Sequence, residues 1–416
     1  MIPAEHLDTY ARLLVEHAVS LRPDQDLYVR GSSEHDDFAL RVGEAAYGIA
    51  RSVSYHLVDA ERLAQLIRRG TPEQIELYCA KERAFHAEII EKGGALIYLS
   101  NHYELPEPVQ EAVHANPRGW AMFIQNRQEI FSHLAKPTTR RLFAATSAPA
   151  ATPRWANKLF PTLEEATALE RLWRLLLGVS LADRSDALEH VRARAATQRQ
   201  RETALNQLGI TALHITGNGN DLKLALSRRA RWVGTGFQTA SGQSCYPNFP
   251  SEEIFTAPDR RKAEGRLVAS HPLRLYNGIE IDNLVLEFRA GRVVAFQSDN
   301  GREAFAKWLQ TDDGARRLGE IGLVSQDSGI SRAGTRFDFN NLDENTAAHL
   351  ALGQTLPFTI ENSENLTETE LQALGWNRSA IHTDVLFGSE KVTIRATRSR
   401  VGEVVLIDEG RWGEGL

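Results

Sequence analysis

The character of the sequence changes near Leu208, and this change constrains the fold more than any other feature. Before about Pro161, segments with a helical period alternate with short apolar runs that predict strands at 26–30, 52–58, 95–99 and 120–124. After Leu208 the strand-like runs are short and are separated by turn residues. The first pattern is typical of parallel β-α-β units, and the second is typical of antiparallel sheets.

The length of 416 residues exceeds that of a typical single core, so we expect two domains. We predict an α/β N-terminal domain at 1–205 and an α+β, largely antiparallel β-rich, C-terminal domain at 206–416. A charged stretch at 162–207, rich in Ala and Leu, predicts two bridging helices interrupted near 178–186. The stretch at 144–153 is rich in Ala, Thr, Ser and Pro and predicts a loop.

The composition is that of a soluble globular protein, with 42% hydrophobic and 25% charged residues. A net charge of −6 gives no reason to expect nucleic acid or an anionic membrane as a partner. The N-terminal residues have a helical period and carry acidic groups, unlike a secretory signal, and no run approaches the length of a membrane span. We therefore expect a cytoplasmic protein. Cys79 and Cys245 are far apart, so a disulfide framework or a thiolate zinc site is not expected.

The stretch from Phe337 to Asp384 contains the best candidates for chemistry. It offers donors suited to divalent metal ions, namely Glu344, His349, His382 and Asp384. Two more carboxylates lie upstream, Glu253 in NFPSEEIFTAP and Glu320 in LGEIGLV. Apolar neighbours would bury both carboxylates, which is unfavourable unless a cation or hydrogen bonds compensate the charge.

The spacing of these residues indicates which of them can act together. IHTDVLF predicts a strand, and side chains two apart on a strand project from the same face, so His382 and Asp384 can reach one metal ion. The segment 343–352 instead predicts a helix, with His349 near its end. Glu344 would then lie about 140° from His349 around the helix, so the two share a metal only if the first turn is irregular.

Each of these residues also has a structural interpretation. A His beside apolar residues is more often a hydrogen-bonded core residue than a ligand, and a lone buried Glu is usually a cap or an ion-pair member. The spacing His-x-Asp also occurs by chance. In the N-terminal half, His35, His56 and His102 have no carboxylate or Cys partner at a suggestive spacing, so we predict surface positions for them.

Several blocks of sequence, in order, resemble the signature segments of the M29 family of metallo-aminopeptidases, the aminopeptidase T and aminopeptidase S enzymes. The blocks are NFPSEEIFTAPDRRKAEG, GARRLGEIGLVSQDSGIS, FDFNNLDENTAAHLALG and IHTDVLFGS. The similarity extends to LGITALHITGNGNDLKLAL and HPLRLYNGIEIDNLVLEF. Several ordered blocks are far more specific than any one of them.

The resemblance implies a set of metal ligands at Glu253, Glu320, His349, His382 and Asp384, with Glu344 as a further ligand or as the acid/base group. It also implies that the C-terminal domain at 206–416 is the metal-binding catalytic domain, with two divalent metal ions (zinc, cobalt or manganese). The resemblance further implies peptide substrates with a free N-terminus and a homodimer enclosing the sites. Two ions bridged by a carboxylate would lower the pKa of a shared water and polarise the scissile carbonyl. Glu344 or Glu253 would accept the water proton.

One departure from the family leaves alternatives open. Members usually carry a Tyr seven residues after the His of the HLALG-like block, and here that position is Leu356. One alternative is a non-haem Fe(II) ring-opening dioxygenase, because such enzymes resemble this region and use two His and one carboxylate. The loss of the Tyr favours this alternative, whereas the retention of Glu253 and Glu320 opposes it. A catalytically inactive dimeric scaffold is the second alternative.

Restoring the Tyr tests the peptidase hypothesis. A Tyr hydroxyl beside the metals could stabilise a developing oxyanion, and one such donor contributes about 10² to 10³-fold in kcat. Leu356→Tyr should therefore raise kcat with little change in KM, because the donor acts on the transition state and not on the ground state. If Leu356 instead forms part of an apolar wall, the larger side chain should cost about 1 to 3 kcal/mol of stability. Steady-state kinetics and a melting curve on the same variant distinguish these outcomes.

Overall fold

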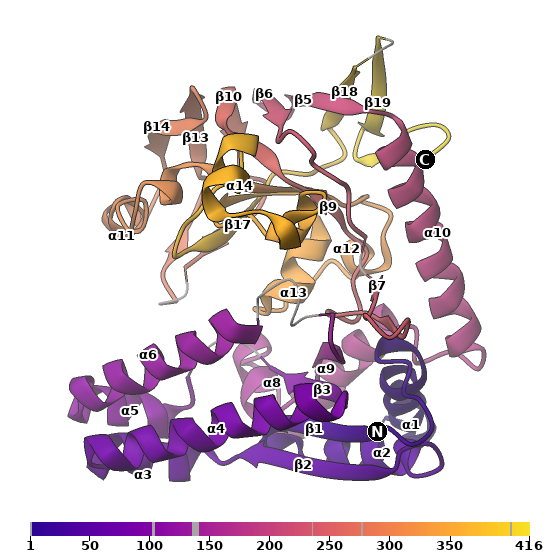
Figure 1. The fold of residues 1–416 in the computed structure, drawn as a ribbon, viewed down its shortest axis with the longest axis vertical. Helices are drawn as coiled ribbons and strands as arrows, with labels where there is room; N and C mark the ends of the chain where they lie inside the picture. The colour runs from indigo at the N-terminus through magenta and orange to yellow at the C-terminus, as the bar shows by residue number, and fades with distance from the viewer. Residues whose placement is uncertain (1, 102–104, 135–140, 235, 276–277, 400–401) are drawn as a thin grey trace. The chain divides into compact units, whose positions relative to one another are not determined.

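The computed structural model describes residues 2–101, 105–134, 141–234, 236–275, 278–399 and 402–416. The chain divides into two compact units, and Figure 1 labels many of their helices and strands. Unit 1 consists of residues 1–193 and 236–250, and unit 2 consists of residues 194–235 and 251–416. Helix α10 (Ala187–Gln207) contains the first crossing from one unit to the other. The expected boundary between residues 205 and 206 stays a prediction.

Unit 1 is built on a four-stranded parallel sheet in the order β2-β1-β3-β4. Its strands are β1 (Asp26–Ser32), β2 (Ser52–Val58), β3 (Ala95–Ser100) and β4 (Ala144–Pro149), with a small hairpin of β7 (Phe237–Gln238) and β8 (Ser244–Cys245). Its helices are α1 (Ala4–Leu13), α2 (Asp36–Ala46), α3 (Ala60–Arg69), α4 (Pro72–Lys92), α5 (Glu107–Ala115), α6 (Pro117–Leu134), α8 (Pro153–Leu159) and α9 (Glu165–Val179). The predicted α/β class is confirmed, and the two helices predicted at 162–207 are present as α9 and α10. α9 lies wholly within unit 1, and the bridging role of the pair stays a prediction.

The parallel sheet of unit 1 is covered on both faces because successive strand residues point to opposite sides. Along β1, Leu27 and Val29 join the core formed with α1, α2 and α9. Tyr28, in contrast, packs against Ile89 of α4 on the other face. This two-sided burial explains why the central strands read as nearly continuous apolar runs.

Two predictions for unit 1 are wrong. Residues 120–124 form part of helix α6, because Trp120 and Phe123, three apart, pack against Ile75 of α4 as a helical stripe. Most of the stretch 144–153 is not a loop, since residues 144–149 form β4 and α8 begins at Pro153. The pairing of β4 with β3 and the burial of its small side chains outweigh their low strand propensity.

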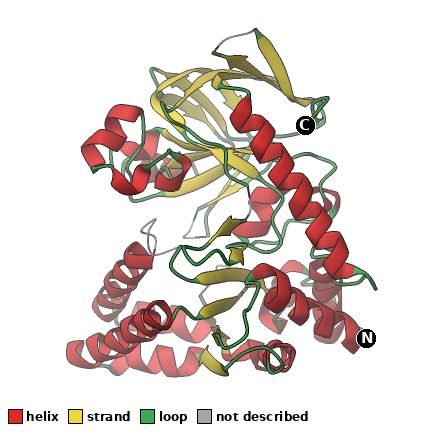
Figure 2. Ribbon diagram, turned by 45° about the vertical axis from the view of Figure 1, so that its right-hand side comes forward, coloured by secondary structure: helices red, strands yellow, loops and turns green. Residues whose placement is uncertain are grey.

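Unit 2 is mainly antiparallel, as predicted, and Figure 2 shows that strands dominate it whereas helices dominate unit 1. An eight-stranded sheet runs β14-β13-β10-β6-β5-β18-β19-β20, and a four-stranded sheet runs β17-β16-β15-β9. The strands of the larger sheet are β5 (Ile210–Gly217), β6 (Asn220–Leu226), β10 (Pro258–Val268), β13 (Val285–Arg289), β14 (Arg292–Gln297), β18 (Thr393–Arg398), β19 (Glu403–Asp408) and β20 (Arg411–Trp412). Those of the smaller sheet are β9 (Ile254–Thr256), β15 (Leu318–Leu323), β16 (His349–Gly353) and β17 (His382–Leu386). Both sheets contribute to one apolar core.

The remaining elements of unit 2 are short. They include the strand pair β11 (Leu273–Arg274) and β12 (Glu280–Ile281), and the helices α11 (Arg302–Trp308), α12 (Gly329–Arg332), α13 (Asn340–Asp343) and α14 (Glu368–Leu374). Among the described residues of the whole chain, no helix combines the length and the apolar character that crossing a membrane requires.

The prediction of surface positions for the N-terminal histidines is wrong for His35, whereas the side chain of His56 is 35% exposed but pairs with a carboxylate. His35 is buried, and His56 Nε2 lies 2.7 Å from Oε1 of Glu82 on α4. The other oxygen of Glu82 accepts a hydrogen bond from Arg30 of β1. His102 lies outside the described residues. Sequence spacing could not reveal the His56 pair, because the sheet and α4 bring together residues that are 26 positions apart.

The buried Glu82 predicts a pH-dependent contribution to stability. Burial raises the pKa of Glu82, but His56 and Arg30 outweigh burial and lower it to about 2. A carboxyl whose folded pKa is depressed stabilises the fold above its unfolded pKa, and this contribution disappears as the pH falls from about 4.5 towards 2. At pH 7, Glu82→Gln should reduce the free energy of unfolding by about 1 to 3 kcal/mol. Urea denaturation between pH 7 and pH 3 should show this difference shrinking in acid.

Glu88→Gln is the matched control, since Glu88 lies on the same helix but is exposed and pairs with Lys92 at the surface. Its effect at pH 7 should be much smaller. A loss of stability in Glu82→Gln that is equal at all pH values would contradict the ion-pair explanation.

Candidate metal centre

The four-stranded sheet of unit 2 separates an apolar face from a face that carries the candidate ligands. Leu350 and Leu352 of β16 and Val385 of β17 point into the core. Because strand side chains alternate, His349 on β16 and the pair His382 and Asp384 on β17 project from the opposite face. The predicted strand at IHTDVLF and the shared face of His382 and Asp384 are confirmed.

The predicted helix at 343–352 is wrong, because helical structure ends early in this segment. Helix α13 ends at Asp343, a 3-10 turn covers Glu344–Thr346, and His349 begins strand β16. All five residues of β16 are buried between β15 and β17. A short apolar run fits a buried helix or a buried strand equally well, and here pairing with two neighbouring strands decides the outcome.

The strand register places the ligands close together and leaves room between them. Glu320 of β15, Ala351 of β16 and Asp384 of β17 lie in one row across the sheet. Gly322 lies opposite His349, and Gly353 lies opposite His382. The small side chain of Ala351 thus lies between Glu320 and Asp384, and Gly322 lies beside His349, which leaves space above the sheet for these ligands.

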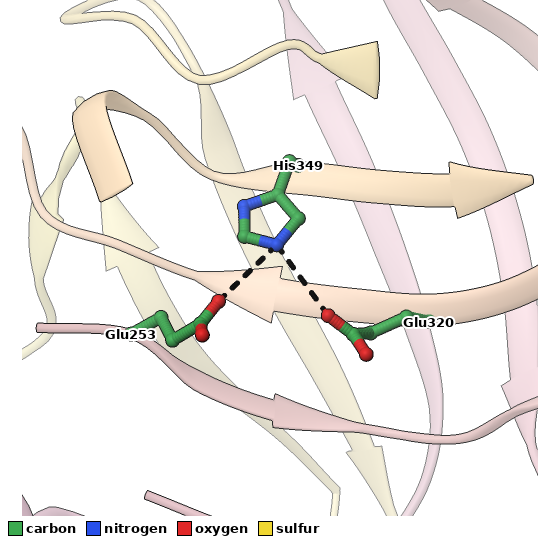
Figure 3. Close-up of side chains that lie close together, drawn as sticks. All are labelled: Glu253, Glu320 and His349. Carbon is green, nitrogen blue, oxygen red and sulfur yellow. Dashed lines mark ion pairs between the residues drawn. The ribbon is translucent and has the colours of Figure 1, made fainter. Parts of the chain in front are cut away.

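Glu320 stands between two groups of candidate ligands. His349 Nε2 lies 3.4 Å from Oε2 of Glu253 and 3.5 Å from Oε1 of Glu320, and Figure 3 shows the imidazole pointing towards both carboxylates.

On the other side of Glu320, its Oε2 lies 4.0 Å from His382 Nε2, which is 3.5 Å from Oδ1 of Asp384. The structure thus forms two trios, Glu253–Glu320–His349 and Glu320–His382–Asp384, and in each trio the donor atoms lie within 4.8 Å of one another. Each trio faces a different oxygen of Glu320.

Main-chain carbonyls orient both histidines. His349 Nδ1 lies 3.2 Å from the carbonyl oxygen of Ala347, and His382 Nδ1 lies 2.7 Å from that of Gln354. A carbonyl can only accept, so Nδ1 of each ring carries a proton, and Nε2, which faces the carboxylates, is the nitrogen that could bind a metal ion. A histidine that binds a metal through one ring nitrogen usually donates a hydrogen bond from the other nitrogen to a carbonyl or carboxylate, and both rings follow this pattern.

The residues present fit divalent metal ions. Among the described residues, Oε2 of Glu253, Nε2 of His349 and Oδ1 of Asp384 are buried and have no hydrogen-bond partner. Buried polar atoms are nearly always satisfied, so three such atoms facing one region need an explanation. Carboxylate oxygens and imidazole nitrogens are the donors that zinc, cobalt and manganese accept. A cation at each trio would use these atoms.

The protonation equilibria indicate how strongly the cluster attracts positive charge. Burial lowers the pKa of His382, but Asp384 and Glu320 outweigh it and raise the value to about 9. Burial likewise opposes the charged form of His349, yet Glu253 and Glu320 raise its pKa well above the ordinary range. The cluster therefore holds protons where a metal would bind, and metal ions must displace them.

Glu344 is buried beside the two trios but belongs to neither. Burial and the neighbouring carboxylates of Glu253 and Asp384 raise its pKa well above the ordinary value of a glutamic acid. Asn340 Nδ2 donates to Oε2 of Glu344 at 2.8 Å and to Oδ2 of Asp384 at 2.9 Å. This amide fixes the position of Glu344 relative to the second trio.

The structure adds residues that the sequence analysis missed. Asn340 had no distinguishing signal, because its partner Asp384 is 44 positions away. Gly322 had a weak signal, since it lies two residues after Glu320 and thus on the same face of the strand.

Leu356, the position where the family usually has a Tyr, is half-buried. It lies two residues after Gln354, whose carbonyl orients His382.

These features define a metallohydrolase-type centre, and comparison with known proteins gives its family. The model of the family described as thermophilic metalloprotease (M29) matches residues 4–412. The chain therefore belongs to the M29 family of metalloproteases.

Individual relatives agree with this assignment over almost the whole chain. The protein is 31% identical over 421 residues to aminopeptidase T of Thermus aquaticus and 30% identical over 415 residues to aminopeptidase PepS of Streptococcus thermophilus. Each alignment covers 98% of both chains. The solved structure of wild-type AmpT from Thermus thermophilus matches with a TM-score of 0.81 and 28% identity, over 98% of this chain and 99% of that one. The resemblance inferred from the sequence blocks is confirmed.

The close contact between Gly322 and His349 provides a test of the geometry. A Cβ at residue 322 would lie 2.3 Å from Cε1 and Nε2 of the His349 ring. Real Cβ atoms do not approach so closely, so Gly322→Ala should displace the imidazole and weaken zinc binding by about 10-fold or more. Competition with a chelating indicator measures the zinc Kd.

Gly48→Ala is the control, because a Cβ there meets nothing within 4 Å. It should bind zinc as the wild type does. Zinc affinity unchanged in a folded Gly322→Ala protein would mean that His349 is not a ligand.

Proposed function

We propose that this protein is a metal-dependent aminopeptidase that removes N-terminal residues from peptides. The observation that carries the proposal is the pair of ligand trios that share Glu320, together with membership in the M29 metalloprotease family. Neither a ring-opening dioxygenase nor an inactive scaffold needs two adjacent trios, so the geometry favours the peptidase.

The two trios suggest how the metal ions would be held. Glu253 and His349 would hold one divalent ion, His382 and Asp384 would hold the other, and Glu320, which belongs to both trios, would contribute to both. Zinc, cobalt and manganese all suit this set of one imidazole and two carboxylates per ion. When bound, such ions supply an activated water and polarise the scissile carbonyl.

Glu344 is the group that we assign to proton transfer. It lies next to both trios, where burial and the carboxylates of Glu253 and Asp384 raise its pKa above the ordinary value of a glutamic acid, and a carboxyl group so placed can exchange a proton with a bound water. Asn340 engages Oε2 of Glu344, which leaves Oε1 for the water proton and then for the leaving amine. Glu253 is less suited, because its Oε2 faces His349 within a trio.

The remaining expectations follow from the family. Relatives named aminopeptidases act at the N-terminus, and a metal ion or an acidic side chain of this centre would hold the free α-amine of the substrate. Peptides, and not nucleic acids or membranes, are the proposed partners. We also propose a homodimer and a cytoplasmic location.

The activity test uses amino-acyl p-nitroanilides with and without a blocked amine. Protein loaded with Co²⁺ or Zn²⁺ should hydrolyse the unblocked substrate and refuse the N-acetylated one, because exopeptidase action requires the free amine. Release of p-nitroaniline measures both rates. Equal cleavage of the blocked substrate would rule out the exopeptidase proposal.

Metal analysis of the purified protein separates the alternatives. Two zinc-type ions per chain are expected. One iron per chain without hydrolysis would indicate the dioxygenase, and a protein that binds no divalent ion would indicate the scaffold.

A further inference from the structure

Asn345 is a fully buried amide whose hydrogen bonds all reach the backbone or side chains around the metal centre. Its Oδ1 accepts from Oγ of Ser251 at 3.0 Å and from the backbone N–H groups of Glu252 at 2.6 Å and Glu253 at 3.0 Å. Its Nδ2 donates to the carbonyl oxygen of Asn341 at 3.0 Å. Three donors converge on one oxygen, so the acceptor capacity of this side chain is fully used.

These hydrogen bonds connect two carboxylates that are far apart in the chain. Asn345 directly follows Glu344, and it holds the backbone of Glu253, some 90 residues earlier in the sequence. Glu253 faces His349 in the first trio, and Glu344 lies beside both trios. The Asn345 amide thus fixes the spacing between a proposed metal ligand and the proposed proton-transfer group.

Other contacts to this segment do not replace those of Asn345. Oε1 of Glu252 accepts from the N–H of Gly329 at 2.9 Å and lies 3.4 Å from Arg194, and Gln198 donates to the Glu252 carbonyl. These contacts hold the side chain and the carbonyl of Glu252. The two N–H groups that immediately precede the Glu253 side chain go to Asn345.

An amide also suits the charge of its surroundings. Four carboxylates, those of Glu253, Glu320, Glu344 and Asp384, are already buried around this centre. An aspartate at residue 345 would add another buried charge, at a high desolvation cost. The neutral Asn accepts the same three hydrogen bonds without that cost.

We infer that Asn345 is a positioning residue for the metal centre, which sets the place of Glu253 relative to His349 and Glu344. This inference rests on the proposed function, since it assumes that the trios bind metal. Metal sites tolerate displacements of only a few tenths of an ångström in their ligands. Loss of the Asn345 acceptor leaves three donors unpaired, two of them buried, so the Glu253 segment must shift to find other partners.

The test measures zinc affinity of the full-length protein, stripped of metal, by competition with a chelating indicator. Asn345→Ala should weaken zinc binding about 10- to 100-fold, which is the usual effect of removing a group that orients a ligand. The melting temperature of the metal-free variant reports separately on the fold. A purely structural role would lower the melting temperature and leave the zinc Kd of the folded protein unchanged.

Asn220→Ala is the matched control. Asn220 is also buried, and both ends of its amide bind backbone groups, the carbonyl of Gly217 at 2.9 Å and the N–H of Val268 at 2.7 Å. It lies in the eight-stranded sheet and not beside the trios. It should lose stability while keeping the wild-type zinc Kd.

The outcomes separate this inference from the proposed function. Wild-type zinc affinity in folded Asn345→Ala would overturn the inference and leave the function standing. If that variant does not fold, Asn345→Ser is measured in its place. The shorter Ser side chain cannot reach all three donors, so a wild-type zinc Kd in this variant would again overturn the inference. Wild-type protein that binds no divalent ion would refute the proposed function, and the inference with it.

Discussion

The mutual repulsion of four buried carboxylates is the constraint on which the rest of the site depends. Glu253, Glu320, Glu344 and Asp384 are each at most 9% exposed, and like charges in a low-dielectric environment are strongly unfavourable unless cations or protons compensate them. In the metal-free protein the two histidines supply part of that compensation, as the raised pKa of His382 indicates. A pair of divalent ions would supply more, which is the physical reason why this centre suits a metalloenzyme.

The sheet makes this concentration of charge possible. One face of β15, β16 and β17 belongs to the core of unit 2, and its burial holds the strands in a fixed register. The other face can therefore display ligands at fixed positions, with Gly322 making room for the imidazole of His349. Uncharged groups hold these ligands in place. The amides of Asn340 and Asn345 bind Asp384 and the backbone of Glu253, and main-chain carbonyls orient His349 and His382. Rigid support of this kind is what a catalytic site requires.

Unit 1 has a different relation to function. Its buried polar cluster around Glu82 is fully paired, with Arg30 and His56 as partners, and it resembles a stabilising network more than a reactive one. Chemistry in the described residues is thus concentrated in the antiparallel unit. Membership in a metalloprotease family whose model spans residues 4–412 indicates that both units belong to the enzyme.

The sequence by itself determined the fold class, the strand that carries His382 and Asp384, and, through the ordered M29 blocks, the family. These depend on local periodicity and on residue identity, which a sequence displays directly. The tertiary structure alone decided that His349 lies on a strand, because pairing with β15 and β17 selects between two conformations that its apolar neighbours permit equally. It also decided the roles of Gly322, Asn340 and Asn345, since each acts on a partner that is distant in the chain and leaves no pattern in its own neighbourhood.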